Sequence, residues 1–188
     1  MAGDIHTTSG TKFSISTTAV ASTTDTLTEY EALTWTEIEE VEDIGNIGDV
    51  SNEVTGAAIG DGRVRKAKGA RNAGTMNVIC FHDPLGAGQQ ALIDAEATND
   101  NYAFKIELPD APPPTGTPTF QYFRGLVMSK ELRLGTNDNI MRRAFKIGVN
   151  SEVTEDPATV GALTARGGEG GTTTATTQPK ERAEATAR

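Results

Sequence analysis

The chain has 188 residues, a formal net charge of -9, 36% hydrophobic residues and a single cysteine. That length suits one domain with flexible ends, and the composition supports one core but not two. The acidic balance argues against a dedicated nucleic-acid-binding protein, which neutralises phosphates with clustered Lys and Arg. No window approaches the ~18 unbroken apolar residues that a membrane-spanning helix needs. We therefore expect one domain with no internal disulfide and no membrane partner.

The first residues, 1–11, are small and polar, and we interpret them as an N-terminal arm. They lack a basic region followed by an apolar run, so we expect no secretory signal. From Lys12 the pattern changes to period two, because Phe13 and Ile15 alternate with serines. Such alternation marks a strand with one buried face, and a second stretch of this kind covers residues 33–39.

The most informative segment covers residues 43–74, because charges of opposite sign are separated within and around it. The stretch 29–53 contains many Asp and Glu but no Lys or Arg, whereas 63–71 is rich in Lys and Arg. Glycines punctuate the whole segment, which predicts a long loop or flexible hairpin between strands. Loops of this length inside a domain are uncommon and usually functional.

A charge-segregated loop can be a docking device, in which the acidic half of one subunit meets the basic half of its neighbour. The alternative is a solvated loop whose charges only increase solubility. On the first interpretation, the candidate contacts between subunits are Glu39, Glu40, Glu42, Asp43, Ile44, Ile47, Asp49, Glu53, Arg63, Arg65, Lys66 and Lys68.

A third alternating stretch covers residues 75–81, and the pattern after it predicts a helix over residues 84–98. Asp83 is a favourable N-cap, and Pro84 suits the first helical position. At helical spacing one side of this segment is apolar, so we expect an amphipathic helix laid against a sheet. That apolar side consists of Leu85, Leu92 and Ile93.

Three more alternating stretches complete the strand pattern, and the clearest of them is 102–108, with a large apolar residue at every second position. The other two, 119–130 and 144–149, flank residues 135–139, whose small polar side chains suit a hairpin connection. After Ser151 the strand pattern stops.

The end of the chain is rich in Gly and Thr and has almost nothing to bury, so it cannot offset its ordering entropy. We therefore predict a domain over residues 12–153 and a flexible tail over residues 154–188. The predicted fold class is mainly β, with two packed β-sheets, one flanking helix and a long loop between strands.

Little in the sequence could support catalysis or metal binding. His6 lies in the arm, and His82 and Asp83 are neighbours that would point to opposite faces of a strand. Cys80 lies in an apolar stretch, where an inert buried thiol is expected. No Cys/His set has zinc spacing, and the glutamates at 37–42 lack the loop chemistry of a calcium site. We predict no enzyme activity, no cofactor and no metal.

Three stretches carry a family resemblance: TWTEI at 34–38, VEDIGNIG at 41–48 and GRVRKAKG at 62–69. In this order and spacing they resemble the tail tube (major tail) proteins of lambda-type phages with long, non-contractile tails. The motif TSGT at 8–11 and the predicted helix are also similar. The resemblance covers most of residues 8–153, and the C-terminal tail departs from it.

The resemblance implies a structural subunit of the virion tail, made and assembled in the host cytoplasm. It implies homo-hexameric rings that stack through the long loop and the terminal arms around a central channel. A tape-measure protein would lie inside during assembly, with tail terminator and tail-tip proteins as further partners. Viral DNA would pass without specific binding. Within the loop, Ile44 and Ile47 are then expected to be apolar anchors that order only on contact with another ring.

Two other functions fit the same residues. One is the related inner tube of a contractile tail or secretion machine, which the long loop does not separate from the first. The other is a monomeric β-sandwich binding module, which would need an exposed row of aromatic side chains. Its candidates are Tyr102, Phe104, Tyr122 and Phe123, and their alternation places most of them inside.

Overall fold

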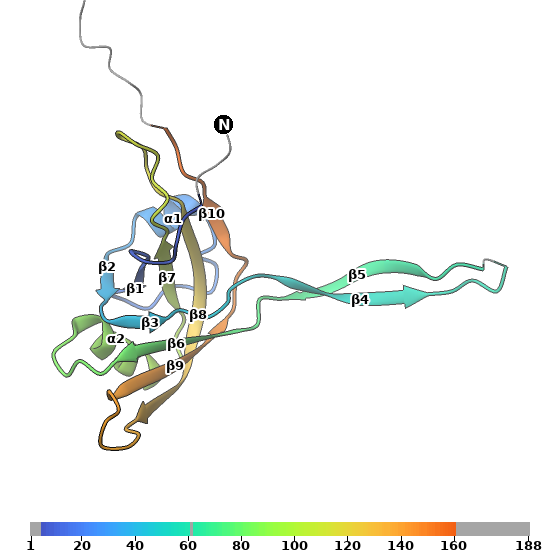
Figure 1. Ribbon diagram of the computed structural model, residues 1–188. Helices are drawn as coiled ribbons and strands as arrows, with labels where there is room; N and C mark the ends of the chain where they lie inside the picture. Colours follow the sequence, from blue (N-terminus) through green and yellow to red (C-terminus); the bar gives the residue numbers. More distant parts are fainter. Residues whose placement is uncertain (1–4, 61, 161–188) are drawn as a thin grey trace, which may run out of the picture.

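The computed structural model describes residues 5–60 and 62–160, and the predicted tail beyond residue 160 lies outside the described residues. The described part contains ten strands and two helices (Figure 1). In chain order these are β1 (Lys12–Ser16), α1 (Leu27–Glu31), β2 (Trp35–Ile38), β3 (Val41–Asp43), β4 (Val50–Gly56), β5 (Arg65–Asn72), β6 (Thr75–Phe81), α2 (Ala87–Glu96), β7 (Tyr102–Glu107), β8 (Phe120–Arg133), β9 (Arg142–Val149) and β10 (Thr154–Asp156).

Eight strands form one antiparallel sheet in the order β2-β1-β7-β8-β9-β6-β3, with β10 paired to β8. The first and last strands of this order, β2 and β3, are consecutive in the chain and are joined only by Glu39 and Glu40. Glu40 has a φ of 58°, and its carbonyl accepts a hydrogen bond from the Phe81 amide of β6. This tight turn brings the two ends of the sheet together, so the sheet curves around a single core.

Inward-facing side chains from β1, β2 and β6 to β9 fill that core, as the alternation predicts. Phe104 stacks on Phe13 at a ring-centroid distance of 5.8 Å and on Phe123 at 5.2 Å. Helix α2 covers the core and contacts β1, β2 and β8. A Cβ on Gly88 of α2 would lie 2.5 Å from the Ile38 Cα, so only glycine allows this close approach.

A smaller cluster covers the other face of the sheet, where the segment between β1 and β2 packs through α1. Tyr30 of α1 is fully buried and stacks on Tyr122 of β8 at 5.5 Å. Arg124, only 6% exposed, fastens this segment by an ion pair with Asp25 at 3.1 Å and a hydrogen bond to the Ala21 carbonyl at 3.3 Å. The sheet is therefore covered on both faces in this region.

The mainly β class with two sheets is confirmed, but the sheets are arranged differently from the expectation. One curved eight-stranded sheet encloses the core together with helix α2, and the second sheet is the two-stranded hairpin of β4 and β5, which lies apart from the core (Figure 1). The predicted strands of the body are found, and β8 continues to Arg133, past its predicted end. Strand β10 was not predicted, and it shows that the strand pattern does not stop at Ser151.

The predicted helix is shorter than expected. It begins at Ala87 with Gly86 as its N-cap, so the assignment of Asp83 as the cap is wrong. Asp83 instead accepts a hydrogen bond from the Leu85 amide at 2.9 Å, which forms a turn before the helix. Leu85 consequently lies outside the helix and is 92% exposed, whereas Leu92 is buried as predicted. The second helix, α1, was not predicted.

Candidate assembly interface

The segment 43–74 is a projecting hairpin, one of the two forms expected for it. Strands β4 and β5 pair only with each other, from Val50 opposite Asn72 to Gly56 opposite Arg65. Figure 1 shows them extending away from the body. At about 3.3 Å per residue, the seven residues of β4 span roughly 23 Å.

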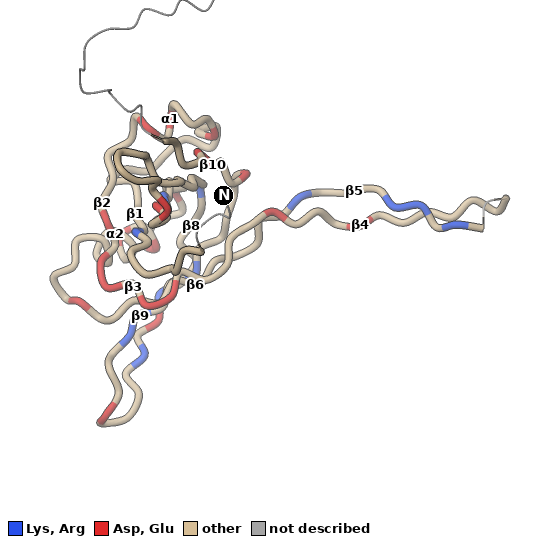
Figure 2. The backbone as a smooth tube through the Cα atoms, turned by 45° about the horizontal axis from the view of Figure 1, so that its top comes forward, with Lys and Arg blue, Asp and Glu red and all other residues tan. Residues whose placement is uncertain are grey.

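The sequence analysis expected the acidic and the basic residues to form the two halves of one loop. In the structure most of the acidic residues lie on the body, and the basic residues lie on the hairpin. Glu39, Glu40, Glu42 and Asp43 lie in the body, on β3 and on the turn before it, whereas the basic residues follow β5 and its approach. Figure 2 shows red segments on the body near β3 and blue segments along the hairpin. The hairpin is thus mainly basic, and the acidic group lies behind it on the body.

Two acidic candidates, Asp49 and Glu53, do belong to the hairpin region. Glu53 Oε2 accepts a hydrogen bond from Lys66 Nζ at 2.9 Å, with both side chains exposed. An exposed pair of this kind contributes about 0–1 kcal/mol. Part of the predicted acidic–basic pairing therefore occurs within one subunit.

The hairpin also carries apolar side chains that its own subunit does not cover, and the sequence analysis missed them. Four large aliphatic residues are at least half exposed there: Val50, Val54, Ile59 and Val64. The strands have no buried residue, whereas β6 alternates between exposed and buried positions. The sequence did contain a signal for them, because Val50 and Val54 share one face of a short strand whose other residues are mostly polar.

At the base of the hairpin, the chain is held to the body. Ile44 and Ile47 are half-buried and pack against the subunit's own core. Gly45 between them has a φ of 76°, and a Cβ there would lie 2.7 Å from the Asn77 carbonyl oxygen. The expectation that Ile44 and Ile47 order only on contact with another ring is therefore wrong, because their own subunit already positions them.

An ion pair fixes β3 beside the base. Arg142 of β9 donates two hydrogen bonds to the Glu42 carboxylate, one from Nε to Oε2 and one from Nη2 to Oε1 at 2.8 Å. These hydrogen bonds lower the pKa of the Glu42 carboxyl and raise the pKa of the Arg142 guanidinium. Glu42 thus has a partner within its own subunit, in addition to the contact between subunits predicted for it from the sequence.

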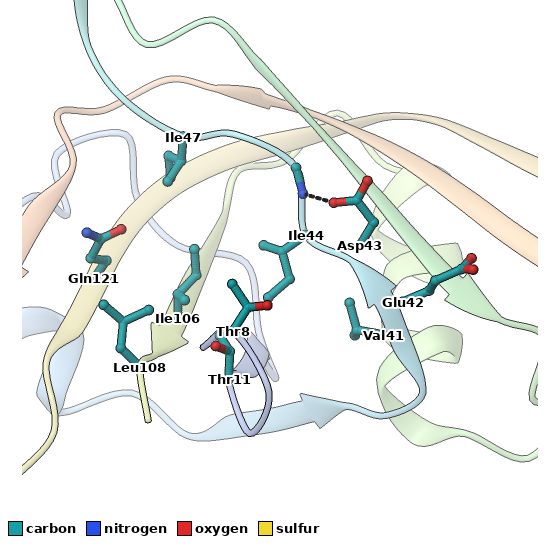
Figure 3. A pocket seen from close by; sticks show the side chains of 11 residues that line it. Thr8, Thr11, Val41, Glu42, Asp43, Ile44, Ile47, Ile106, Leu108 and Gln121 are labelled. Carbon is teal, nitrogen blue, oxygen red and sulfur yellow. Dashed lines mark hydrogen bonds between the residues drawn. The ribbon is translucent and has the colours of Figure 1, made fainter. Parts of the chain in front are cut away.

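A pocket of about 280 Å³ opens beside this base, between the N-terminal arm and β3 (Figure 3). Thr8 and Thr11 line it from the arm, and its apolar lining consists of Val41, Ile44, Ile47, Ile106 and Leu108. Glu42 and Asp43 are its acidic residues. The Thr11 hydroxyl oxygen is buried and has no hydrogen-bond partner within the described part of the chain. Nothing in the sequence pattern indicates this pocket, because its residues come from four separate segments.

A second extension is formed by the distal ends of β8 and β9, below the body in the view of Figure 1. Several of its large apolar residues are about half exposed or more: Met128, Leu132, Leu134, Ile140 and Met141. Residues 126–133 of β8 pair with β9 alone, so one edge of this strand is unpaired in the sheet.

The described residues contain no cluster of three or more His, Cys, Asp and Glu that could hold a metal ion. Cys80 is fully buried, and desolvation raises the pKa of its thiol to about 12. Neither helix in the described ranges is long and apolar enough to cross a membrane. Phe104, Phe123 and Tyr122 are buried and Tyr102 is half-buried, so these four side chains do not form the exposed aromatic row that a binding module would need.

Comparison with solved structures shows what the fold is similar to. The chain superposes on a protein of the anti-feeding prophage (AFP) baseplate with a TM-score of 0.56 and 8% identity, covering 78% of this chain and 91% of that one. It superposes on the SPP1 tail tube with a TM-score of 0.51 and 14% identity, covering 83% and 81% of the two chains.

Comparison of sequences identifies the family. A search of curated proteins gives no match. The family described as "Phage tail tube protein, TTP" matches residues 2–156, which include the whole body, the hairpin and β10. The chain therefore belongs to the phage tail tube protein family.

Proposed function

We propose that copies of this subunit close into hexameric rings and that the rings stack through the projecting hairpin. As a member of its family, the chain is a structural component of a virion tail and not an enzyme. The observation that carries the stacking proposal is the hairpin itself, which presents basic and apolar surface about 20 Å long that its own body leaves uncovered. A two-stranded hairpin without such cover is marginally stable.

Unpaired strand edges support closure within a ring. An unpaired strand edge can form hydrogen bonds with another chain, which leads to aggregation if the pairing is not specific. When identical copies pair in a closed ring, the same edge forms a specific contact between subunits. The distal half of β8 offers such an edge, with exposed apolar residues beside it. Six-fold closure is supported by the likeness to the AFP baseplate protein, whose structure is described as 6-fold symmetrised.

The remaining partners follow from the family resemblance. A tape-measure protein inside the tube, terminator and tail-tip proteins at its ends, and viral DNA in the channel are the proposed partners. The net charge of -9 per chain would let an acidic channel repel DNA phosphates during passage. The electrostatic potential of an assembled lumen tests this, since a mainly positive bore would exclude it.

Electron microscopy of the purified full-length protein tests the assembly. We expect rings and tubes at high protein concentration, and a count of subunits around a ring seen end-on gives the symmetry. A persistent monomer would contradict the proposal, and a symmetry other than six would correct the ring.

Charge reversal on the hairpin tests the stacking contact. The variant Arg65→Glu/Lys66→Glu/Lys68→Glu should block tube growth and leave the thermal unfolding midpoint almost unchanged, because these side chains pack against no core. The size of the particles by light scattering and circular dichroism of the same samples report the two properties separately. Normal tubes from this variant would remove the hairpin from the stacking contact.

A further inference from the structure

We infer that the distal end of the hairpin of one copy docks in the pocket at the hairpin base of another copy, with Ile59 entering between Ile44, Ile106 and Leu108. This rests on the proposed stacking and names the surface that receives the hairpin. The pocket is lined by the arm, β3 and the ends of β7 and β8 (Figure 3).

The distal end has an apolar side chain that needs cover. Ile59 is fully exposed, and Val64 on the returning chain is more than half exposed. Within the described residues, no atom beyond the chain neighbours of Gly60 and Gly62 lies within 4 Å of a Cβ added to either glycine. An exposed aliphatic residue at the end of a projecting hairpin is suited to enter an apolar pocket on a partner.

The pocket provides the complementary surface. Aliphatic side chains make up much of its lining, and its volume of about 280 Å³ far exceeds the ~15 Å³ that one water molecule requires.

Charge also matches across the proposed contact. Glu42 and Asp43 lie at the pocket, and Glu39 and Glu40 are exposed on the adjoining turn. The incoming hairpin carries basic residues, Arg63 and then Arg65, Lys66, Lys68 and Arg71 on β5, which outnumber its acidic residues Asp49, Glu53 and Asp61. Complementary charges of this kind set the register of a contact and speed its formation.

The occupant comes from a second copy and not from the same subunit. The hairpin leads away from the body, so its distal end does not reach the pocket at its own base (Figure 1). Each copy therefore has one free distal end and one free pocket, on different surfaces. A head-to-tail contact joins two different surfaces, so each added copy offers a free surface to the next one. The assembly then grows without limit unless the rotation between copies closes it into a ring. Such a contact extends a stack of rings along one axis.

Cysteine cross-linking tests the contact. Ile59→Cys and Thr8→Cys are made singly in the full-length chain, where the native Cys80 is fully buried. Both substituted positions are exposed in the subunit, so folding should be unaffected. When the two variants are mixed, assembled and oxidised, we expect a disulfide-linked dimer of one copy of each, because Cα atoms about 5.5 Å apart can be bridged.

The matched control pairs Ile59→Cys with Leu85→Cys, an equally exposed aliphatic position between β6 and α2, and should give at least tenfold less dimer. Tubes that form normally from the Ile59→Cys and Thr8→Cys mixture without the cross-linked dimer would overturn the pocket assignment and leave hairpin stacking intact. Failure of the wild-type chain to form tubes would instead overturn the proposed function. As a second test, Thr8→Trp should fill the pocket and slow tube growth at least tenfold; unchanged growth would contradict the inference.

Discussion

The body and the hairpin use the same strand geometry for different purposes. In β6 every second residue is buried, and the strand contributes to a core shared with six other elements. In β4 and β5 no residue is buried, although the strands are as long as those of the body. The comparison teaches that burial within one subunit fixes the body, whereas the hairpin has to obtain its cover from another molecule. Substitutions in the two regions should therefore affect different measurements.

The largest difference in the loss of unfolding free energy is expected between alanine variants of Phe123 in the body and Val54 on the hairpin. Phe123 is 0% exposed and stacks on Phe104, so Phe123→Ala should lower the unfolding free energy by about 3–5 kcal/mol. Val54 is 54% exposed on the hairpin, and Val54→Ala should change it by no more than about 0.5 kcal/mol. Urea denaturation of the unassembled subunits measures both. Equal losses would show that the hairpin is packed on the body in solution.

Arg124 tests how the outer segment is attached to the body. Its guanidinium is buried and holds the 17–34 segment through Asp25 and backbone carbonyls. Arg124→Met should cost about 2–3 kcal/mol, because bonds from a charged donor are lost and the carbonyls lose their partner. The control Arg133→Met removes an exposed arginine on the distal part of β8 and should cost less than about 0.5 kcal/mol. Similar losses of unfolding free energy for both variants would show that the bonds of Arg124 do not hold the 17–34 segment on the body.

Gly45 tests the junction between the two regions. Its φ of 76° and the 2.7 Å approach of an added Cβ to the Asn77 oxygen both disfavour a side chain. Gly45→Ala should therefore cost about 1–3 kcal/mol and displace the start of the hairpin. Gly56→Ala, at a hairpin position with nothing within 4 Å, is the control and should be close to neutral. Hydrogen exchange of the β3 and β6 amides would locate the disturbance, and an unperturbed β3 would argue against strain at this junction.

How far the sequence predicts the structure differs between the regions. Alternation was sufficient for body strands such as β6 and β7, because each has one face in the core. Helix α1 was missed, although Thr26 and Glu29 have capping-box spacing and the Glu29 carboxylate accepts a bond from the Thr26 amide at 3.1 Å. With five residues, α1 has too little periodicity to stand out, and tertiary packing of Tyr30 stabilises it.

The candidate interface was predictable only in part. Charge segregation pointed to the hairpin, since like charges cluster along the chain and remain together on β5. The pocket was not predictable, because Thr8, Ile44, Leu108 and Gln121 meet only after the sheet has curved. The pairing of Glu42 within its own subunit was not predictable for the same reason, since its partner Arg142 lies 100 residues away in sequence.

The smallest effect should come from the Glu42–Arg142 pair, and it should depend on pH. Hydrogen bonds from Arg142 lower the pKa of Glu42 in the folded subunit, so the pair stabilises the fold above the unfolded-state value near 4.5. That stabilisation is lost as the pH falls through the lowered folded-state pKa. Glu42→Gln should thus lower the thermal midpoint slightly at pH 7 and leave it unchanged at strongly acidic pH. Glu53→Gln removes only an exposed pair within the hairpin and should alter the midpoint at neither pH. A pH-independent difference for Glu42→Gln would mean that packing, and not the ion pair with Arg142 of β9, accounts for the contribution of Glu42 to stability.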